Sequence, residues 1–381
     1  MSMLKSLRKD TQEIFATESH SESDLDYRKI LRRHFGSVEE PGYQGYLLEE
    51  YEPPFPPPKT PSFKFIDLFA GIGGFRLAMQ ELGGRCVFSS EWDQSAKRTY
   101  YRNFGEVPFG DISQFTTEKV TDRKLKKLIP DHNIICAGFP CQPFSLAGVS
   151  SRNSLGKSHG FKCETQGTLF FDIARIASVK KPDFMILENV ANLLNHDGGR
   201  TFSVISETVQ SLGYHFSYAI LDARSIVPQK RRRCFMICSK KSAYPKIELP
   251  IIEGKPIPLK TVLEKRVPSK YTISDKLWAG HKRRTKVNLA RGTGFTAFSA
   301  DLNKPANTLV ARYGKDGKEC LIPQNGKNPR KLTPRECARL QGFPENYILP
   351  ESDAASYRQF GNSVPVPLVR LVLKQIEEFI K

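Results

Sequence analysis

Short apolar runs alternate with segments of helical spacing through the middle of this chain. Such alternation is typical of a parallel sheet whose faces are covered by helices. The apolar runs predict strands at residues 63–69, 85–91, 132–138, 183–189, 217–223 and 234–240. The segments between them predict helices at residues 74–82, 93–104, 167–181 and 200–213. We therefore expect an α/β fold with a doubly wound, Rossmann-like sheet.

The pattern breaks on both sides of this region. Residues 51–61, YEPPFPPPKTP, hold too much proline for a helix or a central strand. Residues 1–60 are therefore interpreted as an N-terminal extension that ends in a linker, with a capping-box-like helix start near Ser23. The α/β domain is expected to cover residues 61–242.

Beyond residue 242 the alternation ends, and residues 243–349 are basic and rich in turns. They predict a second, smaller domain, in which TPRECARLQG forms a helix with Thr333 as N-cap and Pro334 at the first helical position. Residues 350–381 are expected to complete the first domain. Their last part, from YRQFGNSV onward, predicts a loop followed by an amphipathic helix.

The net charge of +18 indicates a polyanionic partner. Residues 1–60 hold 8 Lys and Arg against 11 Asp and Glu, a net charge of −3, so the remaining residues hold 50 against 29, or +21. The excess therefore lies in the body of the chain. A single basic run is most often a solvated face, but the summed excess favours nucleic acid.

The eight cysteines are scattered, with neither a C-x-x-C pair nor the spacing of a zinc site. They are interpreted as reduced thiols, with no metal and no disulfide framework. No apolar stretch approaches the length of a membrane span, and the first residues lack the apolar core of a signal peptide. We expect a cytoplasmic protein.

A ligand site is predicted where the first strand ends, in FIDLFAGIGGF. Gly71 and Gly73 would allow a ligand to approach the N–H groups at the start of the next helix, although Arg76 replaces the third glycine of the dinucleotide pattern. Glu91 ends the second strand, where a carboxylate can accept hydrogen bonds from ribose hydroxyls. Trp92 beside it offers a face for stacking an adenine.

Asp111 and Ile112, in the sequence GDI, are expected to close a third strand, with the carboxylate near the adenine amino group. A nucleoside cofactor without a pyrophosphate fits these residues best, and S-adenosylmethionine is such a ligand. The alternative is that each residue is an ordinary strand end or a partly buried aromatic.

A reactive thiol is predicted in GFPCQPFS, which follows the strand at 132–138. Most cysteines are packing residues, and that explanation suits Cys136 inside the strand. Cys141 lies instead in a polar loop between Pro140 and Pro143, at the edge of the sheet where such folds bind ligands. A nucleophilic role would require positive surroundings that favour the thiolate.

Such surroundings are offered by PQKRRRCF, which leads into the last strand. Strand alternation would direct Arg231 and Arg233 to one side and Arg232 to the other. A solvated basic loop is the alternative. Glu188 ends an apolar strand in ILENV, so burial is expected to raise its pKa and allow it to act as an acid. An exposed strand-end carboxylate is the alternative there.

The order of these motifs resembles that of the DNA cytosine-5 methyltransferases of type II restriction–modification systems. The motifs are FIDLFAGIGGF, EWD, GDI, GFPCQPFS, GTLFFDIARI, ENV, PQKRRR, RKLTPRECARLQGFP and QFGNSV. The resemblance runs from about Phe63 to the C-terminus and leaves aside residues 1–60 and the variable part near 245–325. It implies a Rossmann-like, S-adenosylmethionine-dependent methyltransferase domain with a smaller target-recognition domain.

The resemblance also implies a mechanism on a cytosine flipped out of the duplex. Cys141 would attack C6 as a thiolate, and Glu188 would contact N3 and the exocyclic amine. Arg233 and Arg231 would hold O2 and support Glu188. The C5 atom would then take the methyl group, and loss of its proton with expulsion of Cys141 would restore the ring.

The resemblance assigns cofactor contacts to Phe69, Gly71, Gly73, Glu91, Trp92, Asp111, Ile112, Pro140, Leu169 and Asn362. Ser145 belongs to a loop that could close over DNA. The segments LARGTGFTAF and ANTLVARYGKDGKECLI resemble the recognition region of enzymes that methylate CCGG-, CCWGG- or CCNGG-type sites. In them, base edges or phosphates would be bound by Arg291, Arg312, Lys315 and Lys318.

The implied partners are double-stranded DNA and a cognate restriction endonuclease, and the enzyme is expected to act as a monomer. An RNA cytosine-5 methyltransferase is a rival reading, disfavoured because a sizeable basic region precedes RKLTPREC. A second rival is a DNA-binding regulator whose methyltransferase domain has no catalytic activity. It is disfavoured because Cys141, Glu188 and Arg233 are all present. A second role for residues 1–60, in binding the enzyme's own promoter, stays open.

Overall fold

The computed structural model describes residues 52–140, 169–292 and 297–380, which form two compact units. The first unit holds the described residues up to Leu221 together with Arg233–Pro250 and the chain from Val372 onward. The second unit holds Asp222–Arg232 and Ile251–Leu371. The helix predicted near Ser23 lies outside the described residues.

The first unit is built on a sheet in which all six predicted strands are confirmed. They are β1 (Phe63–Leu68), β2 (Gly84–Ser90), β3 (Ile134–Gly138), β4 (Phe184–Val190), β5 (Tyr214–Asp222) and β6 (Arg232–Lys240). Their order is β2-β1-β3-β4-β6-β5. β1 pairs in parallel with β2 and β3, and β3 with β4.

The sheet is mostly parallel, as the alternation predicted, but β6 runs antiparallel to β4. Only residues 223–231 separate β5 from β6, and a parallel neighbour needs a longer crossover connection. The short return places the start of β6 beside the end of β4. This arrangement brings Arg233 to the carboxyl edge of the sheet.

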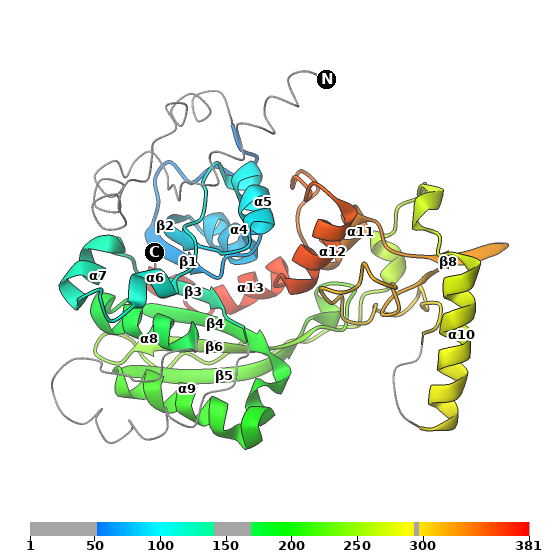
Figure 1. The fold of residues 1–381 in the computed structure, drawn as a ribbon. Coiled ribbons are helices and arrows are strands. Elements are labelled where there is room, and N and C mark those ends of the chain that lie inside the picture. The colour runs from blue at the N-terminus through cyan, green and yellow to red at the C-terminus, as the bar shows by residue number, and fades with distance from the viewer. Residues whose placement is uncertain (1–51, 141–168, 293–296, 381) are drawn as a thin grey trace. The chain divides into compact units, whose positions relative to one another are not determined.

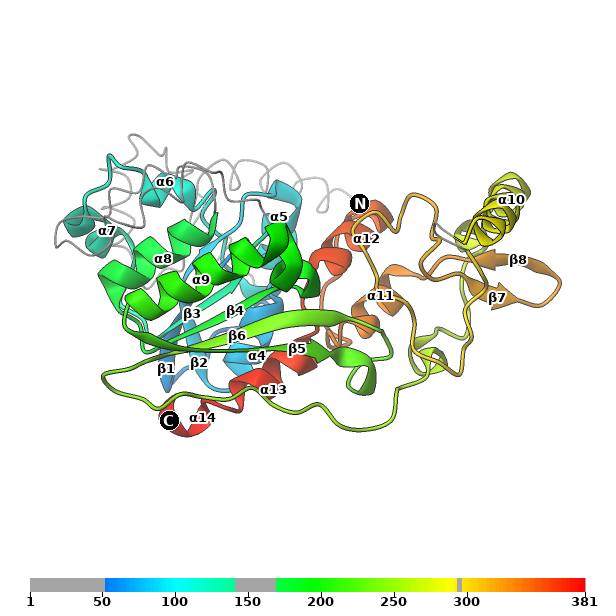
Figure 2. The same cartoon turned by 90° about the horizontal axis from the view of Figure 1, so that it is seen from below.

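Helices cover both faces of this sheet, with α8 and α9 side by side on one face and α4 on the other (Figures 1 and 2). The four predicted helices are confirmed as α4 (Gly74–Glu81), α5 (Gln94–Phe104), α8 (Leu169–Lys180) and α9 (Arg200–Ser211). The unit also holds α6 (Ser113–Thr116), α7 (Asp122–Leu128) and α14 (Glu377–Ile380). In the described parts of the chain, every helix is too short or too polar to cross a membrane.

The central strands β3 and β4 begin as apolar runs because both of their faces are buried, and polar side chains appear only near the end of β4. β3 and β4 bury nearly every residue, and Ile135 and Leu187 belong to a continuous cluster that includes Ile173 from α8 and Ile205 from α9. This packing fixes the strand ends, where the candidate site residues lie.

The strand predicted to end at Asp111 is not formed in the described structure. Only an isolated bridge joins Phe109 to Ser90, and Asp111 lies in the turn before α6. Pro108 lacks an N–H group and Gly110 has no side chain to pack, so the pairing of Phe109 with β2 does not extend into a longer strand.

The second unit contains few regular elements. They are α10 (Asp275–Ala290), β7 (Ile322–Gln324), β8 (Lys327–Arg330), α11 (Pro334–Leu340) and α12 (Asp353–Asn362), and α13 (Val366–Leu373) follows at its end. The predicted cap of α11 is confirmed, with Thr333 and Glu336 forming a capping box and Pro334 following the cap. The loop predicted at QFGN is instead the last turn of α12, because Ser352 caps a helix that begins well before it.

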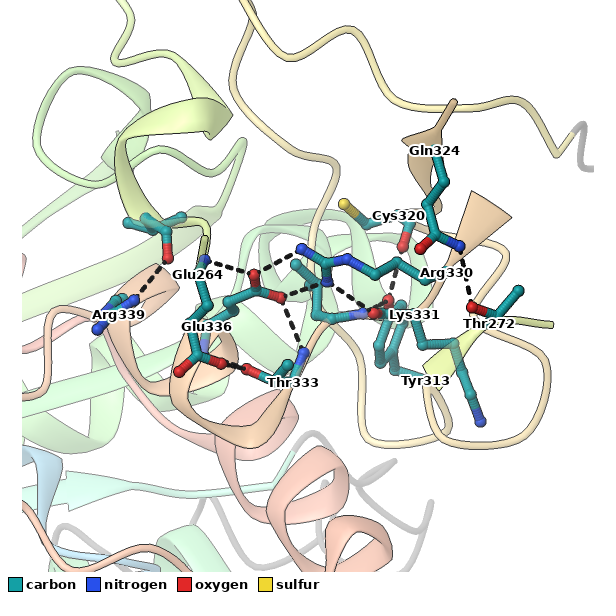
Figure 3. Close-up of polar contacts among 12 residues, drawn as sticks. Glu264, Thr272, Tyr313, Cys320, Gln324, Arg330, Lys331, Thr333, Glu336 and Arg339 are labelled. Carbon is teal, nitrogen blue, oxygen red and sulfur yellow. Dashed lines mark hydrogen bonds and ion pairs between the residues drawn. The ribbon is translucent and has the colours of Figure 1, made fainter. Parts of the chain in front are cut away.

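A buried carboxylate organises this unit (Figure 3). Glu336 is fully buried and accepts two hydrogen bonds from the guanidinium of Arg330, both 2.8 Å. The backbone N–H groups of Thr333 and Glu264 donate to the same carboxylate at 2.9 and 2.8 Å. The carboxylate therefore joins β8, the start of α11 and the segment near Glu264.

Replacing Glu336 with glutamine should destabilise the protein by about 3–5 kcal/mol, because Arg330 would keep a buried charge without its counterion. Urea unfolding measures this as a lower midpoint at constant m-value. The control is Glu345→Gln, which breaks the exposed ion pair with Arg339 and should cost no more than about 1 kcal/mol. Equal midpoints for the two variants would contradict the assignment.

Candidate functional site

The turn between β1 and α4 has an unusual backbone. Phe69, Gly71 and Gly73 all have positive φ angles, of 56°, 55° and 78°. A Cβ atom at Gly73 would lie 2.2 Å from the ring of Phe104, so only glycine fits there. The left-handed conformation of Phe69 is uncommon for a residue with a side chain, and such strain is frequent at ligand sites.

Glu91 is bonded directly to this turn. The N–H of Gly71 donates to its Oε2 and the N–H of Asp93 to its Oε1, both at 2.8 Å. Burial raises the pKa of Glu91, and these two hydrogen bonds oppose the rise. Each carboxylate oxygen has a second lone pair with which to accept another donor. Trp92 is 78% exposed, so the face of its indole is uncovered.

The segment that leads to Asp111 runs beside the end of β2. The N–H of Glu91 donates to the carbonyl of Phe109 at 2.8 Å, and the hydroxyl of Ser90 donates to the carbonyl of Gly110 at 2.6 Å. Asp111 accepts from the N–H of Ser113, whereas Ile112 is buried. The structure thus brings the two predicted carboxylates, Glu91 and Asp111, to the same edge of the sheet.

The remaining predicted cofactor residues are Leu169, Pro140 and Asn362. Phe69 and Leu169 pack against the apolar cluster that also contains Ile112. Pro140 is exposed and follows Phe139, whose ring lies 5.8 Å from that of Phe170 at the start of α8. Asn362 belongs to the second unit, where it is exposed at the end of α12.

Glu188 and Arg233 form an ion pair at the carboxyl end of β4, with 3.0 Å between Arg233 Nε and Glu188 Oε1. In the antiparallel register Val190 faces Arg233, so Glu188 and Arg233 are diagonal neighbours on one face. On the other side, Glu188 pairs with Gly138, and a Cβ atom there would lie 3.4 Å from Oε2. Glu188, which is 8% exposed, therefore holds its carboxylate beside Gly138, three residues before Cys141.

Asn189 contributes a contact that the sequence reasoning missed. Its buried Nδ2 donates to the carbonyl of Phe139 at 2.9 Å, two residues before Cys141. The available signal was its place directly after Glu188 in ILENV, where a buried amide at a strand end needs a partner. Asn189 therefore anchors the beginning of the loop to β4.

Cys141 and Ser145 lie outside the described residues. The described thiols nearby are poor nucleophiles, since burial raises the pKa of Cys136 well above its usual value and that of Cys234 to about 12. This agrees with the packing role predicted for Cys136, and the role of Cys141 stays a prediction.

Arg231, predicted to act with Arg233, belongs to the second unit and is 1% exposed. Its guanidinium donates to the carbonyls of Leu309, Gly361 and Ser363 at 2.9, 3.0 and 2.6 Å. Strand β6 begins only at Arg232, so the alternation expected from Arg231 to Arg233 does not extend to Arg231.

The predicted DNA-binding residues other than Ser145 lie on the second unit. Arg291 and Lys315 are exposed, and Lys318 is half-buried. Arg312 is exposed, with its Nε 3.6 Å from the buried carboxylate of Glu319. These guanidinium and ammonium groups can donate to phosphate oxygens and to base acceptors alike.

Residues 63–378 match the family model for the C-5 cytosine-specific DNA methylases. The chain belongs to this family. The predicted membership is confirmed, and the protein is a DNA cytosine-5 methyltransferase. The described residues contain no group of three or more His, Cys, Asp or Glu side chains arranged to hold a metal ion.

Named methyltransferases are similar over most of their length. The chain is 47% identical to Type II methyltransferase M.SsoII of Shigella sonnei over 85% of this chain and 82% of that protein. It is 40% identical to Type II methyltransferase M.HpaII of Haemophilus parainfluenzae, over 90% of this chain and 96% of that protein.

A solved structure of Dnmt2 methyltransferase from S. pombe is similar in fold, with a TM-score of 0.63 and 17% identity over 83% of this chain and 99% of that one. The structure of a DNMT2 mutant from Spodoptera frugiperda gives a TM-score of 0.62 at 21% identity, over 82% of this chain and 99% of that one. The predicted Rossmann-like methyltransferase fold is confirmed by these similarities.

Proposed function

We propose that the enzyme transfers a methyl group from S-adenosylmethionine to C5 of a cytosine flipped out of duplex DNA, through a covalent bond between Cys141 and C6. The observation that carries this proposal is the ion pair of Glu188 and Arg233 beside Gly138, in the strands next to Phe139 and the Cys141 segment. A carboxylate and a guanidinium together match the polar edge of a cytosine.

The residues around the β1–α4 turn fit a nucleoside cofactor. Glu91 is oriented by two backbone N–H groups and keeps lone pairs for ribose hydroxyls, and the uncovered face of Trp92 suits an adenine ring. Asp111 would accept from the adenine amino group. S-adenosylmethionine would supply the methyl group, and the chain's own residues would bind and orient it.

The residues of the chain would act in turn on the cytosine. Attack by the Cys141 thiolate on C6 forms the S–C6 bond and moves an electron pair toward C5. Glu188 hydrogen-bonds N3 and the exocyclic amine and so stabilises that charge, while Arg233 holds O2. After C5 is methylated it loses its proton to a base, and the electron pair expels Cys141 as a thiolate.

The remaining sequence-based predictions describe an enzyme that protects host DNA from a restriction endonuclease. We infer a monomeric cytoplasmic enzyme of a type II restriction–modification system, with a cognate endonuclease as functional partner and a target of CCGG, CCWGG or CCNGG type. Residues 61–242 with 350–381 would catalyse the reaction, and residues 243–349 would read the site. Named type II relatives at 40–47% identity support this inference.

The experiment is methyl transfer from labelled S-adenosylmethionine to mixed-sequence duplex DNA, with a 5-fluorocytosine duplex in parallel. The proposal requires labelled DNA in the first assay and a denaturant-resistant protein–DNA complex in the second. Absence of both would overturn it. Sequencing the cytosines protected in plasmid from expressing cells then identifies the site.

A further inference from the structure

The buried side chain of Arg231 has a definite place at the end of α12. Helix α12 ends at Asn362, and the last carbonyls of a helix have no partner within it. Arg231 donates to the carbonyls of Gly361 and Ser363, the two residues that flank Asn362. A cation at a helix C-terminus is also stabilised by the helix dipole.

Neighbouring contacts hold the same turn from other sides. The side-chain amide of Gln341 donates to the carbonyl of Phe360 at 2.8 Å. A Cβ atom at Gly361 would lie within 2.4–2.6 Å of the backbone of Val310 and Ala311, so the turn packs directly on that segment. Arg231 bonds the same segment through the carbonyl of Leu309. The backbone around Asn362 is thereby fixed while its side chain stays exposed.

We propose that Arg231 is a positioning residue for Asn362: it holds the carbonyls on both sides of Asn362 and so presents that side chain to the cofactor. The proposal rests on the proposed function, in which Asn362 contacts S-adenosylmethionine. It replaces the direct contact with the cytosine that the sequence predicted for Arg231.

The affinity for S-adenosylmethionine, measured in the absence of DNA, distinguishes positioning of Asn362 from direct contact with the cytosine. For Arg231→Lys, which cannot bridge both carbonyls in the geometry of a guanidinium, we expect the Kd for S-adenosylmethionine to rise at least about tenfold. Asn362→Ala should weaken binding similarly, and the double variant should bind no more weakly than Asn362→Ala alone. The matched control is Arg335→Lys, whose guanidinium bonds the carbonyls of Pro344 and Tyr347 and should leave the Kd unchanged.

An unchanged Kd in Arg231→Lys, with loss of the 5-fluorocytosine complex, would overturn the proposal in favour of a cytosine contact. Additive losses in the double variant would also overturn it. Thermal melting confirms that each variant is folded at the assay temperature. If the wild-type protein binds no S-adenosylmethionine, the proposed function itself fails, which is a separate result.

A second inference concerns the exposed side of α10, which lies at the periphery of the second unit beside β8 (Figure 1). One side of the helix is packed, since His281 and Thr285 are buried and bond to Asp316 and Ala297. The opposite side carries Lys276, Arg283 and Lys286, with Lys282 and Arg284 at its two flanks, and all five are exposed.

The positive charge of this face is not balanced by acidic side chains in its own segment of the sequence. No Asp or Glu occurs between Asp275 and Asp301. Like charges three and four residues apart, as at Lys282, Arg283 and Lys286, destabilise a helix. A polyanion bound to the face would offset that repulsion and release counterions.

We propose that this face of α10 binds the phosphate backbone of duplex DNA. Phosphate contacts of this kind set orientation and affinity without reading the sequence. The proposal deepens the proposed function, because it assigns phosphate binding to a surface outside the recognition segments at 289–298 and 306–322. Only the end of α10 overlaps the first of these segments.

The salt dependence of duplex binding tests the surface. Combining Arg283→Gln, Arg284→Gln and Lys286→Gln should reduce the slope of log K against log[salt] by about 2 to 3, since each lost phosphate contact removes about 0.9. Affinity should fall equally for target and non-target duplexes. The matched control removes three exposed charges from α7, by Arg123→Gln, Lys124→Gln and Lys127→Gln, and should change the slope by less than about 0.5.

Equal slope changes in the two triple variants would mean that only net charge matters and would overturn the proposal. An unchanged slope in the α10 variant would do the same. Failure of the wild-type protein to bind duplex DNA would instead count against the proposed function.

Discussion

Methyl transfer should fall by roughly 10⁴-fold or more in Cys141→Ser, because a serine hydroxyl is not ionised at neutral pH and cannot replace a thiolate nucleophile. The same variant should form no covalent complex with a 5-fluorocytosine duplex. Binding of S-adenosylmethionine should persist, since the turn at Gly71 and Glu91 is built without Cys141. Radiolabel transfer and gel analysis under denaturing conditions measure the two losses.

The matched control is Cys136→Ala, five residues earlier in β3. Burial holds the pKa of Cys136 far above neutrality, so this thiol is not available as a nucleophile. Its removal should leave the covalent complex intact. If Cys141→Ser retained wild-type turnover, or if Cys136→Ala abolished the complex, Cys141 would not be the nucleophile.

Turnover should fall by about 10² to 10⁴-fold in Glu188→Gln, the range for loss of a positioned acid or base. Glutamine keeps the shape of the side chain but loses the charge that pairs with Arg233 at 3.0 Å. The cytosine would then lose both a proton-sharing group and a correctly oriented guanidinium. Single-turnover rates at saturating cofactor measure the chemical step directly.

Glu207→Gln serves as the control for this variant, since Glu207 is exposed on α9. It should leave the rate within about twofold, because substitutions on the surface away from the site usually have small effects. Cofactor binding by Glu188→Gln verifies that the protein is folded. A normal single-turnover rate in Glu188→Gln would remove Glu188 from the mechanism.

The fold could be predicted well because its central strands are buried on both faces and are therefore continuous apolar runs. The sequence of β3 and β4 indicates a strand from composition alone, and the capping pattern at Thr333 marks the start of α11 with equal clarity. The direction of β6 could not be predicted in this way, because apolar runs carry no information on which way a strand runs. The connection length between β5 and β6 was the missing signal.

The candidate site was predicted in its residue types more than in its contacts. Glu188 and Arg233 were each singled out, but their pairing depends on the antiparallel register of β4 and β6. Arg231 was grouped with Arg233 by alternation, although the strand begins one residue later. Side-chain-to-backbone hydrogen bonds, such as those of Arg231 and Asn189, join distant segments and leave no periodic trace in the sequence.

The exposure of Trp92 has a practical consequence. The chain contains two tryptophans, Trp92 beside Glu91 in the first unit and Trp278 on α10 in the second, where Lys282 lies 5.8 Å from the ring centroid. Indole emission depends on what stacks against the ring and on nearby charge. The protein therefore carries one intrinsic fluorophore near each of two proposed ligand surfaces, and the single-tryptophan variants Trp92→Phe and Trp278→Phe would allow each to be followed separately in real time.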